Sequence, residues 1–263
     1  MIDYMSKFSL NDKTVFVTGG AGLLGSEVCK AVASLGARLI LLDVNNAKGE
    51  ALTSEIIKNG FKASFEYFDI SDIDNVEKNI IQLIQKFKNA DVWVNAAYPR
   101  TEDWGASLEN LKISSWRKNI DMHLNGYFFS AQKIAEQMKE QKRGSIINFA
   151  SIYGIVAPDF YLYKDTKMTM PAAYSAIKGG IINFTKYLAA YYGKYNIRVN
   201  AVSPGGVYDN QPETFVSRYN EKTPLGRMAN KEDIAGAVIY LASNASSYVT
   251  GHNLVVDGGW SVV

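Results

Sequence analysis

Two side chains four residues apart, Tyr174 and Lys178, are the first candidates for chemistry. They lie in a segment of helical periodicity, Ala172-Ala173-Tyr174-Ser175-Ala176-Ile177-Lys178, and on a helix this spacing places both side chains on one face. A phenol has a pKa of about 10, too high for a base at neutral pH, but a neighbouring ammonium favours the phenolate. The pair could therefore act as a general acid/base. Because the spacing is common and the chain has 16 tyrosines, an amphipathic helix surface is the alternative.

A glycine-rich turn lies near the start of the chain. The segment Thr18-Gly19-Gly20-Ala21-Gly22-Leu23-Leu24-Gly25 follows an apolar run and leads directly into a helical pattern. Glycines let the backbone approach a pyrophosphate, which the N–H groups and dipole of the helix start can bind. We therefore expect a dinucleotide site that includes Gly19, Gly22, Leu23, Leu24 and Gly25. A tight strand-to-helix turn without a ligand is the alternative.

Asp43 ends the second apolar run, about 18 residues after the last of these glycines. An acidic side chain there can accept hydrogen bonds from both hydroxyls of an adenosine ribose, and it would repel a 2′-phosphate. Arg38 begins the same run, too far from its end to offset that repulsion. The sequence thus predicts NAD(H) in preference to NADP(H), with a capping or loop carboxylate as the alternative reading of Asp43.

Short apolar runs rich in β-branched residues alternate with helical segments along the whole chain. This alternation predicts a single α/β domain over residues 1–263, with a doubly wound, seven-stranded parallel sheet covered by helices on both faces. The expected strands are Thr14–Thr18, Arg38–Asp43, Ser64–Phe68, Asp91–Asn95, Ser145–Phe149, Ile197–Val202 and Leu254–Val256. The expected helices are Leu23–Leu35, Ala47–Lys58, Ile73–Lys88, Ser107–Lys139, Ala172–Tyr192 and Lys231–Ser243.

Two segments do not fit the alternation, residues 155–171 and residues 205–224. Each follows the carboxyl end of an expected strand, where open α/β sheets bind ligands. Long irregular loops inside a compact domain are commonly lids or binding loops. We expect both segments to contact the substrate.

Composition excludes several other classes of function. With 28 Lys and Arg against 26 Asp and Glu, a nucleic-acid or anionic-membrane surface has no electrostatic support. One cysteine and two histidines leave no basis for a disulfide framework or a metal cluster. No apolar run is long enough to span a bilayer, and the polar N-terminus does not resemble a signal peptide. A cytoplasmic protein without a metal site is expected.

Taken together, these motifs resemble those of the short-chain dehydrogenase/reductase family, in its single-domain Rossmann-fold branch, over nearly the whole chain. The matching pieces are the glycine turn, Asp69-Ile70, Asn95-Ala96-Ala97, Ser151, Tyr174-x-x-x-Lys178, Arg198-Val199-Asn200-Ala201-Val202-Ser203-Pro204-Gly205-Gly206, Thr250-Gly251 and Val256-Asp257-Gly258-Gly259.

The resemblance implies a role for each of these residues. Ser151 would orient the substrate oxygen and Tyr174 would move its proton. Lys178 would bind the nicotinamide ribose and lower the pKa of the tyrosine. The implied cofactor contacts are Asp69 and Ile70 beside the adenine, Asn95, Ala96 and Ala97 along the cofactor, and Pro204, Gly205 and Val207 near the nicotinamide.

The chain departs from the family pattern at several places. Tyr98 stands where the family has a glycine, and Tyr98-Pro99 would narrow the pocket. The spacing Gly19-x-x-Gly22-x-x-Gly25 is that of the larger nucleotide-sugar epimerase and dehydratase branch. His123 stands where the family has an asparagine that holds a proton-relay water. An imidazole can also relay protons near neutral pH, so His123 is either a catalytic relay or a hydrogen-bonded core residue. Asn125 lies about 200° further around a helix and is a poor substitute.

Ser151 and Tyr174 are about ten residues further apart than is usual in the family, and the extra segment carries Phe160, Tyr161 and Tyr163. Aromatic faces there would stack on a polar ring of the substrate, although a core or subunit-contact plug is equally consistent. The insert, the Ser-Ile-Tyr-Gly turn and Pro-Ala-Ala-Tyr-Ser-Ala-Ile-Lys resemble oxidoreductases of bacterial flagellin and surface-glycan modification, of the legionaminic acid type.

The expected function is NAD(H)-dependent interconversion of a secondary alcohol and a ketone on a sugar or sugar-derived acid, by a homotetramer or homodimer. Two alternatives remain. One is a nucleotide-sugar epimerase or dehydratase that retains its NAD, and the other is a non-catalytic nucleotide-sensing module on the same fold.

Overall fold

The computed structural model describes residues 3–263 and is built on one seven-stranded sheet in the order β3-β2-β1-β4-β5-β6-β7. Every neighbouring pair of strands is parallel, which confirms the expected fold. The strands are β1 (Thr14–Thr18), β2 (Arg38–Asp43), β3 (Ala63–Tyr67), β4 (Val92–Asn95), β5 (Gly144–Phe149), β6 (Ile197–Pro204) and β7 (Asn253–Val256).

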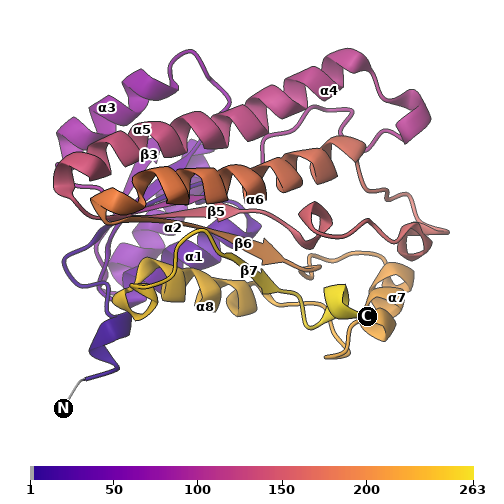
Figure 1. The fold of residues 1–263 in the computed structure, drawn as a ribbon. Helices are drawn as coiled ribbons and strands as arrows, with labels where there is room; N and C mark the ends of the chain where they lie inside the picture. The colour runs from indigo at the N-terminus through magenta and orange to yellow at the C-terminus, as the bar shows by residue number, and fades with distance from the viewer. Residues whose placement is uncertain (1–2) are drawn as a thin grey trace.

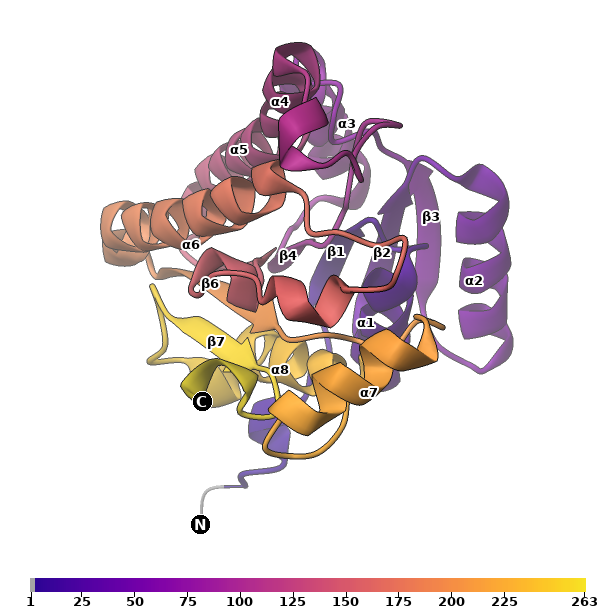
Figure 2. The same cartoon turned by 90° about the vertical axis from the view of Figure 1, so that its right-hand side faces the viewer.

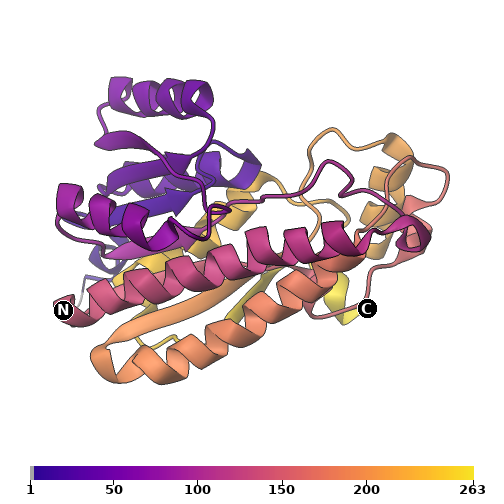
Figure 3. The same ribbon diagram turned by 90° about the horizontal axis from the view of Figure 1, so that it is seen from above.

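Helices cover both faces of this sheet (Figure 1). In that view α3, α5 and α6 lie above the sheet and α1 and α8 below it, and Figure 3 shows α5 and α6 side by side. The helices are α1 (Leu23–Ser34), α2 (Asn46–Lys58), α3 (Val76–Phe87), α4 (Ile113–Asn119), α5 (Gly126–Gln141), α6 (Ala172–Tyr192), α7 (Glu213–Lys222) and α8 (Lys231–Ala242). Among residues 3–263, no helix is both long and apolar enough to cross a membrane.

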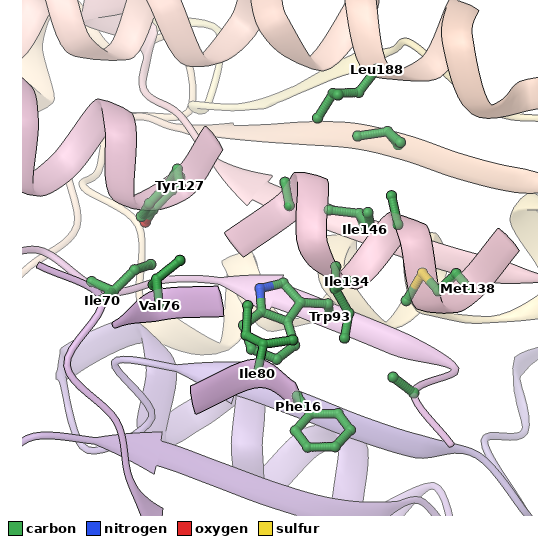
Figure 4. Close-up of a cluster of buried hydrophobic side chains, with 14 of the residues drawn as sticks. Phe16, Ile70, Val76, Ile80, Trp93, Tyr127, Ile134, Met138, Ile146 and Leu188 are labelled. Atoms are coloured by element: carbon green, nitrogen blue, oxygen red, sulfur yellow. The ribbon is translucent and has the colours of Figure 1, made fainter. Parts of the chain in front are cut away.

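The central strands β1, β4 and β5 are buried on both sides because each side packs against helices. Phe16 of β1 belongs to the core under α5 and α6, whereas Val15 and Val17 belong to the core against α1 and α8. In the first core, Trp93 lies among Phe16, Ile80 and Ile134 (Figure 4). Its ring stacks on Phe16 with centroids 5.6 Å apart.

The helix expected from Ser107 to Lys139 begins later, at Ile113, and its register changes within the run. A 3-10 turn (Leu108–Asn110) and α4 come first, and a π-helical turn (Ile120–Asn125) separates α4 from α5. π turns insert a residue into the helical register, and they are frequent at functional sites. Here the turn carries His123, which is fully buried.

The segment 205–224 is also less irregular than expected, because it contains α7. Phe215 and Tyr219 lie four residues apart and are both buried, with Glu213 in the first turn and Lys222 in the last. This amphipathic pattern is typical of a helix, but it spans too few turns to stand out in the sequence. Figure 2 shows α7 near the C-terminus and beside the segment that follows β5. That segment contains 3-10 turns at Ile152–Gly154 and Phe160–Tyr163.

Candidate active site

The ends of β1 and β4 meet where the strand order reverses, the position at which such sheets bind ligands. Gly19 has a φ of 66°, and a Cβ added there would lie 2.5 Å from the Cα of Ala97. Only glycine fits this close approach. The hydroxyl of Thr18 accepts hydrogen bonds from the amides of Ala96 (3.2 Å) and Ala97 (3.4 Å), so the two strand ends are tied together.

The start of α1 is open to an anionic group. Gly22 is its N-cap, no side chain caps it, and its first turn carries no acidic residue. Leu23, the first helical residue, is exposed. Uncapped N–H groups at a helix N-terminus bind phosphate, and the glycines of the turn before them, which have no Cβ, allow the backbone to approach a pyrophosphate closely.

Asp43 lies beside this turn at the end of β2. One carboxylate oxygen accepts a hydrogen bond from the amide of Ala21 and the other accepts one from the amide of Asn45, both at 2.9 Å. A carboxylate has about four acceptor positions, so these two bonds fix its orientation and leave capacity for hydroxyl donors. The glycine turn and the acidic residue that the sequence paired are therefore joined directly.

The other residues expected near the cofactor lie at the same edge of the sheet. After β3, the carboxylate of Asp69 accepts a hydrogen bond from the amide of Ser71 at 2.9 Å, and Ile70 is buried against α5. Asn95 is fully buried, and its amide is hydrogen-bonded to Trp93 and Asn148. Its side chain therefore joins β4 to the core.

The backbone of Ala96 and Ala97, directly after Asn95, is the partly exposed part of that segment. At the end of β6, Gly205 donates a hydrogen bond to the carbonyl of Val256 at 2.9 Å. Val207 pairs with Ala229 in an isolated bridge. These positions therefore face the same end of the sheet as the glycine turn.

Ser151 and Lys178 are brought together by a close backbone contact. Ser151 follows β5 and caps the Ile152–Gly154 turn, its hydroxyl accepting a hydrogen bond from the amide of Tyr153 at 3.2 Å. A Cβ at Gly154 would lie 2.6 Å from the carbonyl carbon of Lys178, so the turn packs directly on α6. Tyr174 lies on α6 together with Lys178. Burial raises the pKa of Tyr174, and the hydroxyl of Ser151 opposes that rise.

Lys178 is 4% exposed and is held at two contacts. Its Nζ donates a hydrogen bond to the carbonyl of Phe149 at 2.7 Å and lies 3.3 Å from Nε2 of His123. The same Nζ is 5.6 Å from the ring centroid of Tyr174. Burial lowers the pKa of the Lys178 ammonium to about 7.

The chain's own residues raise the pKa of Tyr174, mainly through burial and secondly through the neighbouring Tyr98 phenol, whereas Ser151 lowers it. The lowering implied by the family resemblance requires a positive charge close by. Lys178 carries that charge below a pH of about 7. The same burial therefore raises the pKa of Tyr174 and lowers that of Lys178, because it disfavours the charged form of each side chain.

His123 faces Lys178 from the π-helical turn. Burial, and then the charge of Lys178, hold the pKa of its imidazole well below the usual range, so the neutral ring can accept a hydrogen bond at Nε2. Its Nδ1 is buried without a hydrogen-bond partner among residues 3–263. Asn125 instead donates to Asp121 at the surface.

Two aromatic rings lie against Tyr174, one from Tyr98, which the sequence predicts to narrow the pocket, and one from Trp104, which the sequence did not indicate. The rings of Tyr98 and Trp104 lie edge-on to that of Tyr174 at 5.9 and 6.3 Å, and Trp104 Nε1 donates to the Tyr98 hydroxyl at 2.8 Å. Tyr98 replaces a glycine of the family pattern, which is a signal in the sequence. Trp104 comes from an irregular loop, and no spacing links it to the site.

The aromatic insert is divided between core and surface. Leu162 and Tyr163 are buried in a third cluster with Phe215, Tyr219 and Trp260, whereas Phe160 and Tyr161 are each 62% exposed. Of the three aromatic residues of the insert, only Tyr163 is therefore a core residue.

Two ion pairs fasten the insert to α7. Lys222 lies 2.8 Å from Asp159, and Arg218 lies 3.0 Å from Asp165. The two segments that the sequence separated thus form one wall of the site.

Comparison with known proteins identifies relatives that match this chain over its length. A family model described as enoyl-(acyl carrier protein) reductase matches residues 20–261. The post-translational flagellin modification protein A of Campylobacter coli is 35% identical over 96% of this chain and 100% of its own.

Two solved structures are similar throughout. A short-chain dehydrogenase from Leptospira borgpetersenii with bound NAD+ has a TM-score of 0.82 at 35% identity, covering 99% of this chain and 97% of its own. A gluconate 5-dehydrogenase from Burkholderia cenocepacia in complex with NADP and tartrate has a TM-score of 0.89 at 27% identity, covering 99% and 100%.

Proposed function

Because this chain belongs to the short-chain dehydrogenase/reductase family, we propose that it is an NAD(H)-dependent oxidoreductase that interconverts a secondary alcohol and a ketone on a sugar or sugar-derived acid. The observation that carries the proposal is the assembly of Ser151, Tyr174 and Lys178 at the carboxyl end of the sheet, beside the glycine turn. Related proteins of this family are named dehydrogenases and reductases acting on CH–OH groups.

In the proposed reaction the protein binds and orients the substrate and moves one proton. The hydroxyl of Ser151 donates a hydrogen bond to the reacting oxygen, and the Tyr174 hydroxyl gives or takes its proton. Lys178 holds a ribose hydroxyl and, when charged, favours the tyrosinate. A bound nicotinamide would accept or donate the hydride, and the protein would hold the reacting atoms in position for that transfer.

We assign the proton path away from the tyrosine to Lys178 and His123. Their nitrogens are 3.3 Å apart, and Nδ1 of His123 has no partner among the described residues. An unpaired buried polar atom is costly unless a water or another group satisfies it. A water at Nδ1 would extend the path outward, as the family's asparagine does through its own water.

The proposed cofactor contacts follow the sheet edge. The diphosphate would lie against Gly19, Gly22, Leu23, Leu24 and Gly25, and the adenosine ribose against Asp43. Asp69 and Ile70 would border the adenine, and the segment after Asn95 would follow the cofactor. Pro204, Gly205 and Val207 would lie near the nicotinamide. Relatives with NAD+ and with NADP are both known, so the preference for NAD(H) rests on the carboxylate of Asp43.

A polyhydroxylated substrate fits the lining of the site. Several phenol groups lie near Tyr174. It packs against the cluster that contains Tyr153 and Tyr163, whose hydroxyls are 3.4 Å apart, and its ring is edge-on to that of Tyr98. Phenols offer both donors and acceptors to sugar hydroxyls. The flagellin-modification relative supports a role in bacterial flagellin modification, and the gluconate dehydrogenase neighbour supports a sugar acid as the kind of substrate.

A substrate screen with NADH absorbance as the readout tests the proposal. Free and nucleotide-activated amino sugars, neutral sugars, sugar acids and simple hydrophobic alcohols would be offered with NAD+, and the corresponding ketones with NADH. Oxidation of at least one sugar or sugar acid is expected. Turnover only of hydrophobic alcohols would contradict the substrate class.

One observation favours a second function. The spacing Gly19-x-x-Gly22-x-x-Gly25 is that of epimerases and dehydratases that retain NAD. Such an enzyme would copurify with its cofactor and convert a nucleotide sugar without net formation of NADH, which chromatography of the same reactions would detect.

A further inference from the structure

We propose that Arg100 is a specificity-determining residue that binds an anionic group, a carboxylate or a phosphate, on the substrate. The inference rests on the proposed function and adds the charge of the substrate to it. Arg100 follows β4 in the loop that carries Tyr98 and Trp104. Its guanidinium carbon lies 5.1 Å from the ring centroid of Tyr98.

One aromatic residue, Tyr98, contacts both this guanidinium and the candidate catalytic tyrosine. Its ring is edge-on to that of Tyr174 at 5.9 Å and lies 5.1 Å from the guanidinium carbon of Arg100. The guanidinium also lowers the pKa of the Tyr98 phenol, opposing the rise caused by burial. A substrate whose reacting hydroxyl is at Tyr174 would extend past Tyr98 toward this charge.

The guanidinium has no carboxylate partner. Within residues 3–263, no acidic oxygen lies within 4.0 Å of Arg100, whereas Arg218 and Lys222 at the same end of the sheet are both paired. The nearby Asp103 instead accepts a hydrogen bond from the Ser115 hydroxyl. A side-chain hydrogen bond to Tyr98 uses part of the guanidinium. Its remaining N–H donors can bind a carboxylate or phosphate in a bidentate way.

The loop that carries Arg100 is held in place before any ligand binds. The next residue, Thr101, donates its amide to the side chain of Asn119 at 3.0 Å and accepts a hydrogen bond from it at 2.8 Å. Asn119 is itself 1% exposed. Because anchoring reduces the entropy lost on binding, this charge is preorganised toward the site.

Binding measurements with the NADH-loaded protein test the inference without requiring turnover. The probes are D-gluconate, which carries a carboxylate, D-glucose 6-phosphate, which carries a phosphate, and D-glucitol, which carries neither. We expect at least one anion to bind more tightly than glucitol. Arg100→Gln should weaken that anion about 10-fold or more, which is the range for a lost charged hydrogen bond, and leave glucitol unchanged. Arg100→Lys keeps the positive charge but lacks the planar pair of N–H donors. Its affinity for that anion should therefore lie between those of the wild type and Arg100→Gln.

Arg38→Gln is the matched control, because Arg38 also stacks on an aromatic ring, Phe87, at 5.1 Å, but at the amino end of β2. It should leave binding of all three probes unchanged. Selective weakening of gluconate identifies a carboxylate site, and selective weakening of glucose 6-phosphate identifies a phosphate site. Equal binding of anions and glucitol, or anion binding that Arg100→Gln leaves unchanged, would overturn the inference. If no substrate in the screen is turned over with NAD+ or NADH while anion binding still depends on Arg100, the proposed reaction is contradicted and the inference about Arg100 stands.

Discussion

Lys178 is buried at a cost to stability, because a lysine loses its hydration when it enters the core. In the unfolded chain its pKa is near the ordinary value of 10.5, whereas in the folded chain burial lowers the pKa to about 7. Between these values the unfolded state binds more protons, so this group makes stability rise with pH across that window and leaves it flat below a pH of about 7.

We therefore expect Lys178→Met to remove this slope, which for one proton is at most about 1.4 kcal/mol per pH unit. Urea unfolding of the cofactor-free protein at several values between pH 7 and 9.5 measures it for both proteins. If the free energy of unfolding changes with pH in the same way in the wild type and the variant, burial does not lower the pKa of Lys178. The same variant should lose both turnover and cofactor binding, since the ammonium serves the ribose and the tyrosine.

Tyr174→Phe tests the proton-transferring group. Because the phenol touches only the reacting oxygen, we expect cofactor binding to be retained while turnover falls by about 10²- to 10⁴-fold. Tyr187→Phe, an exposed tyrosine on the same helix, should leave both unchanged. A Tyr174→Phe enzyme with near-normal turnover on an identified substrate would contradict the assignment.

Two substitutions of His123 distinguish a role in proton relay from a role in core packing. His123→Asn restores the family's residue and should shift the pH profile of turnover with little loss of rate. His123→Phe preserves the aromatic packing on Tyr98 and Tyr127 but cannot accept a proton from Lys178, so its rate should fall. If His123→Phe keeps the wild-type profile and changes only thermal stability, the imidazole is a core residue.

At the scale of elements, we expect the junction of β2 with the glycine turn to set the preference between NAD(H) and NADP(H). The carboxylate of Asp43 is oriented by the amides of Ala21 and Asn45, and a ribose 2′-phosphate would meet its charge. We expect NADH to bind more tightly than NADPH in fluorescence titrations, and Asp43→Ser to reduce the preference at least about 10-fold, the range for removing a charged contact. Equal or tighter binding of NADPH by the wild type would refute the preference.

Two elements far apart in sequence, the insert after β5 and α7, jointly position the site. The Tyr219 hydroxyl accepts a hydrogen bond from the amide of Gly206, and its ring stacks on Trp260 with centroids 6.0 Å apart. The same aromatic cluster includes Tyr163 and packs against Tyr174. The substrate wall is therefore continuous with a small core of its own, which favours a preformed pocket.

For the whole molecule we expect a homotetramer or homodimer. Tyr187 and Tyr191 of α6 are 64% and 55% exposed with their rings stacked 6.4 Å apart, and the C-terminal Val262 and Val263 are 80% and 74% exposed. Apolar surfaces of this kind are usually covered in closed symmetric assemblies. Light scattering at micromolar concentration measures the mass, and a monomer would contradict the expectation.

The parallel sheet, the glycine turn, and the alignment of Tyr174 with Lys178 were all predictable from the sequence. Each depends on local rules, namely the burial of strands on both faces, the need for glycine at a positive φ, and the period of a helix. These rules act over a few residues, so the chain carries their signal directly.

The surroundings of the candidate catalytic pair, Tyr174 and Lys178, were decided only by the tertiary structure. The wall of Tyr98 and Trp104, the contact of His123 with Lys178, and the single cluster formed by the insert and α7 join residues distant in sequence. Burial also sets the pKa values of Tyr174 and Lys178. Burial depends on the packing of several elements at once, and no spacing within one element encodes it.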